Sequence, residues 1–263
     1  MNHYSGKSDL AAKTCLERLT SLCGITEEFS IITDGLNYFQ GFKLRRELYD
    51  YTTEYCDFLD QLMSDTASWY EIIIEGEHTG YYSHCLGYVA RKTHKGLRII
   101  KPYLSPSKKD KGYPKVDLCP NYPAIEAHLA IAKHTPEHRA FLEFLCEKEK
   151  EVNPAYKMAM ENPEDKKILF NHVNENKFDS RLCNMQICNA TWNSFYSRVL
   201  ESGHESLFEM ILELRRQWAE IVGDGGITRS QKNAFIARVV ESYGVDAKFI
   251  RRIINGDSYK WIK

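Results

Sequence analysis

The sequence has no excess of charge of either sign and no long apolar run. Its 35 lysines and arginines balance 36 aspartates and glutamates, which leaves a formal net charge of −1. Overall charge therefore does not indicate a nucleic-acid partner, and only local clustering can do so. No stretch approaches the roughly 18 consecutive apolar residues of a membrane-spanning helix, and residues 1–13 lack the apolar core of a signal peptide. We expect a cytoplasmic protein with no membrane partner.

Paired cysteines are also missing. The eight cysteines include no C-x-x-C pair, and the closest two are Cys183 and Cys188. Structural zinc sites usually take their ligands from two such pairs, so we expect reduced, partly buried thiols and no structural zinc. Hydrophobic residues make up 43% of the chain, enough to bury the core of one large domain or of two to three small ones.

The pattern of apolar residues predicts three regions in an α+β fold. Residues 1–68 carry apolar residues at helical spacing without a catalytic pattern, and we expect a helical region there. Residues 69–204 combine strands, helices and a polar motif at 168–200. Residues 205–263 contain an apolar stripe at helical spacing and then two shorter helices around a glycine turn.

Local composition predicts the elements of the middle region. β-branched and aromatic runs predict strands at 70–74, 86–89, 97–100 and 113–118. Helical spacing and a Thr-Pro start signal predict helices at 127–133 and 136–150. Basic residues alternate with tyrosines along the strands, a composition that suits a partner lined with phosphates, although a solvated hairpin explains it equally well.

The segment 168–200 predicts a short strand, a polar loop, a second strand and a helix. Its loop is rich in Asn, Asp and Ser, which bond their own backbone and hold tight turns. The second strand is expected at 185–188, and the helix should run to about Leu200. His172, at the end of the first strand, would then face the helix that carries Asn193.

This segment resembles the HNH motif of phage and intron-encoded homing endonucleases. The matching residues, in chain order, are Asn171, His172, Asn176, Arg181, Leu182, Asn184, Met185 and Asn193. Twelve positions separate His172 from Asn184, and nine more reach Asn193. The resemblance implies a ββα-metal core around one divalent cation, with double-stranded DNA as the partner.

The resemblance also implies a role for each matching side chain. His172 would be the general base that activates a water for attack on a phosphodiester. Asn184 would orient the His172 ring by a hydrogen bond. Asn171 and Asn193 would offer oxygen ligands to Mg²⁺ or Mn²⁺, which DNA phosphates would complete.

Three departures from the family pattern bear on activity. Asn171 is neutral where many members carry aspartate, Glu175 replaces the turn glycine after Asn174, and Ser180 stands where asparagine is common. A positive φ at Glu175 would strain the backbone. These changes leave open a DNA-binding regulator with a decayed HNH site. His128 occupies a position that resembles another family histidine, and we expect a structural role for it.

The C-terminal helices resemble a helix-turn-helix. Their second helix would expose Lys248, Arg251 and Arg252 to DNA and pack its isoleucines inward. The expected DNA-contacting elements lie far apart along the chain and there is one nuclease motif. We therefore expect a monomeric homing-type enzyme that spans a long recognition site and nicks or cleaves it. The alternative enzyme is a restriction-type HNH endonuclease that dimerises on a short symmetric site.

Overall fold

The computed structural model describes residues 69–104, 112–118, 121–177, 179–202, 206–223 and 226–262. The described residues form a mixed α+β structure with small sheets. They divide into two compact units, one of 69–152 with 168–188 and one of 153–167 with 189–262. The helical region predicted over 1–68 lies outside the described residues. Among the described helices, none combines the length and apolar character needed to cross a membrane.

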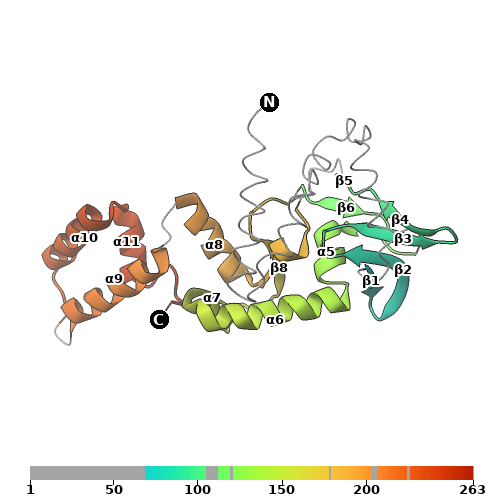
Figure 1. Cartoon of the computed structure of the whole chain (residues 1–263). Helices are drawn as coiled ribbons and strands as arrows, with labels where there is room; N and C mark the ends of the chain where they lie inside the picture. The colour runs from blue at the N-terminus through green and yellow to red at the C-terminus, as the bar shows by residue number, and fades with distance from the viewer. Residues whose placement is uncertain are drawn as a thin grey trace, which may run out of the picture. The chain divides into compact units, whose positions relative to one another are not determined.

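A four-stranded antiparallel sheet with the strand order β1-β2-β3-β4 opens the first unit (Figure 1). β1 (Trp69–Ile74) and β4 (Gly96–Ile100) confirm the predicted strands at 70–74 and 97–100. β1 turns into β2 (Glu77–His84) through Glu75 and Gly76, whose φ values of 53° and 85° match the turn that joins twisted hairpin strands.

The strand predicted at 86–89 was wrong in its position. β2 was not predicted, and β3 (Val89–Thr93) begins where the predicted strand ends. The ring of His84 accepts a hydrogen bond from the backbone of Leu86 at 3.1 Å, and Gly87 follows with a φ of 89°. Leu86 and Tyr88 therefore lie in a turn between β2 and β3. Both are apolar because they pack into the core, and not because they belong to a strand.

Both faces of the sheet are covered by apolar side chains. One face packs with β6 and α5 around Ile72, Tyr81 and Val89, while the other packs around Trp69 and Ala90. A second sheet of order β5-β6-β7 contains β5 (Tyr103–Leu104), β6 (Pro114–Val116) and β7 (Ile125–Glu126). The strand predicted at 113–118 is shorter in the structure, where β6 includes only 114–116. Tyr113 lies before this strand, and Asp117 and Leu118 follow it.

Two helices follow the second sheet, as predicted. α5 (Ala127–Ala132) begins directly after β7, and α6 (Pro136–Val152) begins after Thr135. The buried Thr135 hydroxyl donates to the carbonyl of Ala130 at 2.9 Å and lies 2.7 Å from the hydroxyl of Ser83. These bonds fix the corner between the two helices against β2. The first unit ends with β8 (Leu169–His172), a short 3₁₀ turn (Leu182–Asn184) and β9 (Met185–Cys188).

The second unit is helical. α7 (Pro154–Met160) packs on α8 (Ala190–Ser202), and α9 (Leu207–Val222) packs on α11 (Ala247–Ile254), which also packs on α10 (Arg229–Tyr243). The start of α8 is held by Asp165, whose carboxylate accepts from the backbone and hydroxyl of Thr191 at 2.6 and 2.9 Å. These bounds confirm the predicted helices of the C-terminal region.

Candidate functional site

The β8–β9 hairpin places His172 as the sequence predicted. The two strands pair antiparallel, with His172 opposite Met185 and Asn171 opposite Gln186. Because side chains alternate along a strand, Asn171 and His172 leave opposite faces of the hairpin. β9 is followed after one residue by α8, so the order strand, loop, strand, helix is confirmed over 169–202.

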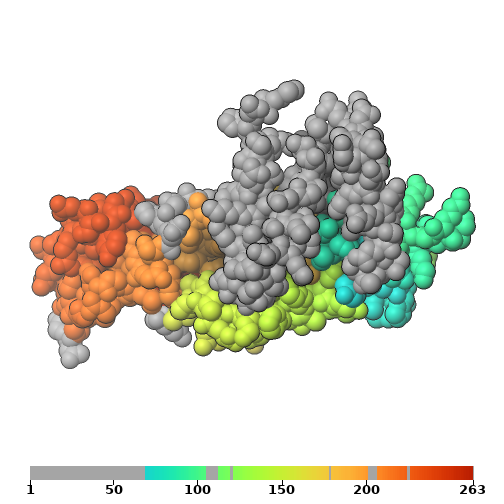
Figure 2. All heavy atoms as spheres, in the orientation of Figure 1, coloured from blue at the N-terminus to red at the C-terminus, as the bar shows by residue number. Residues whose placement is uncertain are grey.

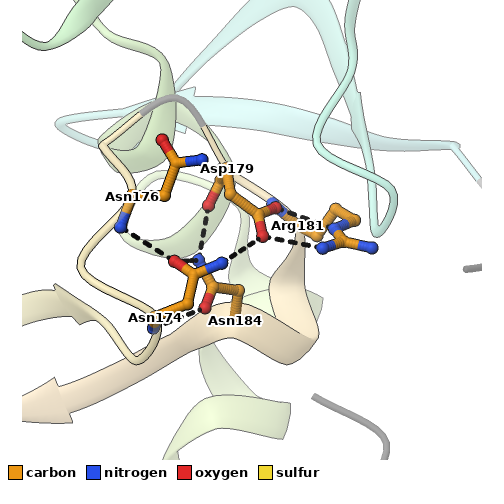
Figure 3. A network of polar contacts seen from close by, with 5 residues as sticks. All are labelled: Asn174, Asn176, Asp179, Arg181 and Asn184. Atoms are coloured by element: carbon orange, nitrogen blue, oxygen red, sulfur yellow. Dashed lines mark hydrogen bonds and ion pairs between the residues drawn. The ribbon is translucent and has the colours of Figure 1, made fainter. Parts of the chain in front are cut away.

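A network of amide side chains closes the loop between the strands (Figure 3). Asn184 donates to the side-chain oxygen of Asn174 at 2.9 Å and to the carbonyl of Asp179 at 2.9 Å. Its own side-chain oxygen accepts from the backbone of Asn174 at 3.0 Å. Asn174 also accepts from the backbone of Asn176 and donates to the carboxylate of Asp179 at 2.8 Å. The network fixes both ends of the loop to the hairpin.

A buried ion pair supports this loop. Arg181 donates to both carboxylate oxygens of Asp179, at 2.7 Å each, and the two side chains are 1% and 0% exposed. A bidentate guanidinium–carboxylate pair of this geometry fixes orientation as well as charge. The neighbouring backbone of Leu182 donates to the carbonyl of Cys85 at 2.8 Å, which ties the loop to the end of β2.

Asn184 has different partners from those implied by the family resemblance. Its three side-chain hydrogen bonds all go to the loop, and the bond expected to the His172 ring is not among them. Asn184 is 0% exposed, so its amide is fully committed to holding the hairpin. In this structure the residue shapes the loop, and the orientation of the His172 ring depends on other neighbours.

Those neighbours are two aromatic rings that sequence reasoning did not place at the site. The His172 ring lies 5.8 Å from the ring of Tyr113, nearly parallel to it, and 4.9 Å from the ring of His128, edge to face. Tyr113 and His128 also contact each other at 4.9 Å, and the amino group of Lys177 lies 4.9 Å above the Tyr113 ring. His128, which we expected to be structural, therefore contacts the proposed base directly.

Burial determines the charge state of the two histidines. His172 is 3% exposed, and burial together with the nearby charge of Lys177 lowers its pKa to about 4. Burial and the neighbouring His172 lower the pKa of His128 to about 3. Both imidazoles are therefore neutral at pH 7. In the described structure, Nε2 of His172 and Nδ1 of His128 are buried without a hydrogen-bond partner.

The two predicted metal ligands lie in different units. Asn171, on β8, is half-buried, and its Nδ2 is buried without a hydrogen-bond partner in the described structure. Rotation of the amide about its Cβ–Cγ bond exchanges nitrogen for oxygen, so an oxygen ligand at this position is compatible with the fold. Asn193 is half-buried on the first turn of α8, in the second unit. Asn171 can thus supply one amide oxygen, and Asn193 is described only within the second unit.

Glu175 adopts the backbone conformation that the missing glycine would favour. Its φ is 56°, in the left-handed region, and its backbone donates to the carbonyl of His172 at 2.9 Å. The tight turn of the motif is therefore kept with a residue that pays a steric cost for it. Ser180, the other departure, is buried with a hydroxyl that has no hydrogen-bond partner among the described residues.

The predicted DNA-contacting residues of the second unit lie on one face of α11. Asp246 caps this helix by accepting from the backbone of Lys248 and Phe249, and Ile250 and Ile253 are buried beneath it. Three cations are exposed on α11, namely Lys248, Arg251 and Arg252. Gly244, with a φ of 65°, forms the turn between α10 and α11. The two helices and the glycine turn that the sequence predicted are therefore present at these positions.

A second basic surface lies on the β3–β4 hairpin, which projects from the first unit in Figure 2. Residues 88–101 carry five lysines and arginines and no carboxylate. Arg91 and Arg98 are both exposed and lie directly opposite each other across the strand pair. Like charges in this position destabilise a hairpin unless an anion lies between or above them. The hairpin therefore exposes two directly opposed positive charges on its surface.

Sequence reasoning missed three members of the site. These are Tyr113, His128 and Lys177. Tyr113 directly precedes β6 and His128 lies on the first turn of α5, so their approach to His172 depends on the pairing of the second sheet and the packing of α5, which no local sequence period reveals. Two signals were present in the sequence, namely His128 at a predicted helix start and Lys177 in the motif loop. Comparison of the chain with protein-family models, curated proteins and solved structures finds no match.

Proposed function

We propose that the chain is a metal-dependent DNA endonuclease of the HNH kind, with His172 as its general base. The observation that carries this proposal is the position of His172. It is a neutral, buried imidazole on the last residue of the first strand, in a strand, loop, strand and helix whose residues keep the HNH register. A neutral imidazole can accept the proton of an attacking water, which an imidazolium cannot.

The chain's own residues would divide the work as follows. His172 takes the proton of the water that attacks the phosphorus. Bound phosphates favour the protonated ring, so DNA binding raises the pKa of His172 from about 4 toward the working pH. Asn171 and Asn193 would each offer an amide oxygen to a Mg²⁺ or Mn²⁺ ion, which would supply electrostatic stabilisation of the phosphate and the leaving oxygen. The network of Asn174, Asp179 and Asn184 keeps the loop rigid.

DNA binding in this proposal uses two basic surfaces. The cations of α11 would enter the major groove as a recognition helix does, and the β3–β4 hairpin would contact phosphates. Each phosphate contact releases counterions, so both surfaces should contribute to the salt dependence of binding. One nuclease centre cuts one strand, and we therefore propose nicking by a monomer.

A DNA-binding regulator with an inactive site is the second candidate. Two observations favour it, namely the 3% exposure of His172 and the strained φ of Glu175. In this case α11 and the hairpin would bind DNA as proposed, and no phosphodiester would be cut.

Supercoiled plasmid that carries the flanking sequence of the chain's own gene distinguishes the two candidates. The wild type, His172→Ala and the control His138→Gln are incubated with Mg²⁺ or Mn²⁺. His138 is as buried as His172 but lies on α6 and bonds Ser83 at 3.2 Å, away from the motif. The nuclease predicts open circles from the wild type and the control, and none from His172→Ala. Tight binding without nicking by the wild type supports the regulator.

A further inference from the structure

The C-terminal tail, residues 258–262, is a folded part of the second unit. It begins where α11 ends, and the backbone of Ser258 donates to the carbonyl of Arg252 at 3.1 Å. It ends at Ile262, whose side chain is buried and whose backbone donates to the carbonyl of Tyr259 at 2.9 Å. The tail therefore continues the last helix as a turn that packs back onto the unit.

Tyr259 of this tail contacts two helices at once. Its ring lies 6.1 Å from the ring of Phe249 on α11 and 5.9 Å from the ring of Phe195 on α8, edge to face in both cases. The guanidinium of Arg198, also on α8, lies 5.6 Å from the centre of the Tyr259 ring and donates to its hydroxyl at 3.0 Å. One side chain of the tail thus connects α11 with α8.

A third helix holds the backbone of the tail. Arg215 of α9 donates to three carbonyls of the tail, those of Ser258, Tyr259 and Ile262. Tyr259 itself has a φ of 56°, in the left-handed region, which is unfavourable for a residue with a large side chain. Such a conformation persists only where the surroundings determine it. The contacts of the ring and the bonds from Arg215 are those surroundings.

α8 carries its motif residue and its tail contacts on different faces. Asn193 lies two positions before Phe195 and five before Arg198 on this helix of 13 residues. With 3.6 residues per turn, Asn193 is rotated by about 160° from Phe195 and by about 140° from Arg198 around the helix axis. Because the helix is a single rigid element, contacts on the tail face also fix the direction of the face that carries Asn193.

We propose that the tail fixes α11 to α8, with Tyr259 and Arg198 as positioning residues that determine where the DNA is cut. They would hold the recognition helix in one place relative to Asn193. Correct placement of the reacting groups would then be reached at one phosphodiester for each bound sequence, whereas loosely joined helices would reach several. The statement about cutting rests on the proposed nuclease function, but the junction of α11 with α8 does not.

The test uses the full-length protein and supercoiled plasmid that carries the flanking sequence of the chain's own gene, with Mg²⁺ or Mn²⁺. Tyr259→Asn removes the ring and keeps a residue that tolerates a positive φ, Tyr259→Phe removes only the hydroxyl, and Arg198→Met removes the guanidinium. The matched controls are Tyr243→Asn, at a tyrosine on α10 that is 38% exposed, and Arg216→Met, at an arginine that pairs with carboxylates of its own helix.

Two readouts are taken from each variant. Sequencing of the nicked strands gives the position of every cut, and hydrogen exchange followed by mass spectrometry reports the protection of α8 without DNA. A variant that is merely less stable cuts less at every bond, but it does not change the positions of the cuts.

We expect the wild type to nick mainly at one bond. In Tyr259→Asn the cuts should spread over neighbouring bonds, and the rate at the main bond should fall on the order of 10-fold to 100-fold. The salt dependence of DNA binding should stay unchanged, because the cations of α11 remain. The amides of α8 should exchange faster. Arg198→Met should show the same changes to a smaller extent, Tyr259→Phe should stay close to the wild type because it keeps the ring, and both controls should change neither readout.

A single cut position retained in both Tyr259→Asn and Arg198→Met would overturn the proposal, as would an equal spread of cuts in the control Tyr243→Asn. Arg198 is exposed, so Arg198→Met keeps the test decisive should Tyr259→Asn fold poorly. Should the wild type not nick DNA, the proposed function fails, and hydrogen exchange then decides on the junction. Faster exchange of α8 with α9 and α10 unchanged would support it, and unchanged exchange of α8 in both variants would refute it.

Discussion

The buried pair of Asp179 and Arg181 offers the sharpest test of how the motif loop is held. Asp179→Asn removes the carboxylate charge and leaves a guanidinium that is 1% exposed without its counterion. Asp179 also accepts from Asn174 Nδ2 at 2.8 Å, so the substitution disturbs the amide network as well. Removal of one partner from a buried ion pair typically costs about 3–5 kcal/mol, far more than the pair contributes over an apolar replacement.

Urea unfolding followed by far-UV circular dichroism measures this cost at equilibrium. Asp179→Asn and Arg181→Met should each lower the free energy of unfolding by about 3–5 kcal/mol, a large part of the 5–15 kcal/mol of an ordinary domain. The double variant Asp179→Leu/Arg181→Met should recover at least about 2 kcal/mol relative to either single variant, since no unpaired charge remains. The control Arg139→Met breaks an exposed pair with Glu143 and should cost less than about 1 kcal/mol. A cost below about 1 kcal/mol for Asp179→Asn would refute this account of the loop.

Three further predictions concern backbone strain, pH and DNA affinity. Glu175→Gly should raise the free energy of unfolding by up to about 1 kcal/mol, because glycine adopts the φ of 56° without strain but loses more chain entropy on folding. Glu175→Val should lower the free energy of unfolding by about 1 kcal/mol. Urea titrations in which valine is tolerated as well as glycine would contradict the left-handed turn. The pKa of His138 is lowered by burial to about 4, so the unfolded chain binds a proton between pH 6.5 and 4 that the folded chain does not. Stability is thus intact above pH 6.5 and should fall by about 2 kcal/mol between pH 7.5 and 5 on account of this residue; His138→Gln should flatten that slope, and an unchanged slope would exclude His138 as a source. Replacement of Lys248, Arg251 and Arg252 by alanine should reduce the slope of log affinity against log salt by about 2 to 3 units; an unchanged slope in fluorescence anisotropy titrations would remove α11 from the DNA interface.

Much of the fold around the site was predictable because its signals are local. The β8–β9 hairpin, α8, and the helix pair around Gly244 follow from apolar periodicity, turn residues and caps that lie within a few positions of each other. The positive φ of Glu175 was also predictable, since the turn that joins the motif residues demands it whichever residue is present. In each case the physical cause acts within a single element or turn.

The surroundings of His172 were not predictable in the same way. Tyr113 and His128 are 59 and 44 positions away along the chain, and their approach depends on the pairing of the second sheet and the packing of α5. The strand predicted at 86–89 failed for a related reason, because Leu86 and Tyr88 owe their apolar character to tertiary burial in a turn. The partners of Asn184 differ from those expected because an amide can form hydrogen bonds with a loop or with a ring, and its choice depends on the folded structure.

The measurement that tests the central claim most directly is nicking of supercoiled DNA by the wild type and by His172→Ala, with and without Mg²⁺ or Mn²⁺. The account predicts metal-dependent open circles from the wild type and from the control His138→Gln, and none above background from His172→Ala. Equal nicking by His172→Ala would contradict the assignment of His172 as the general base.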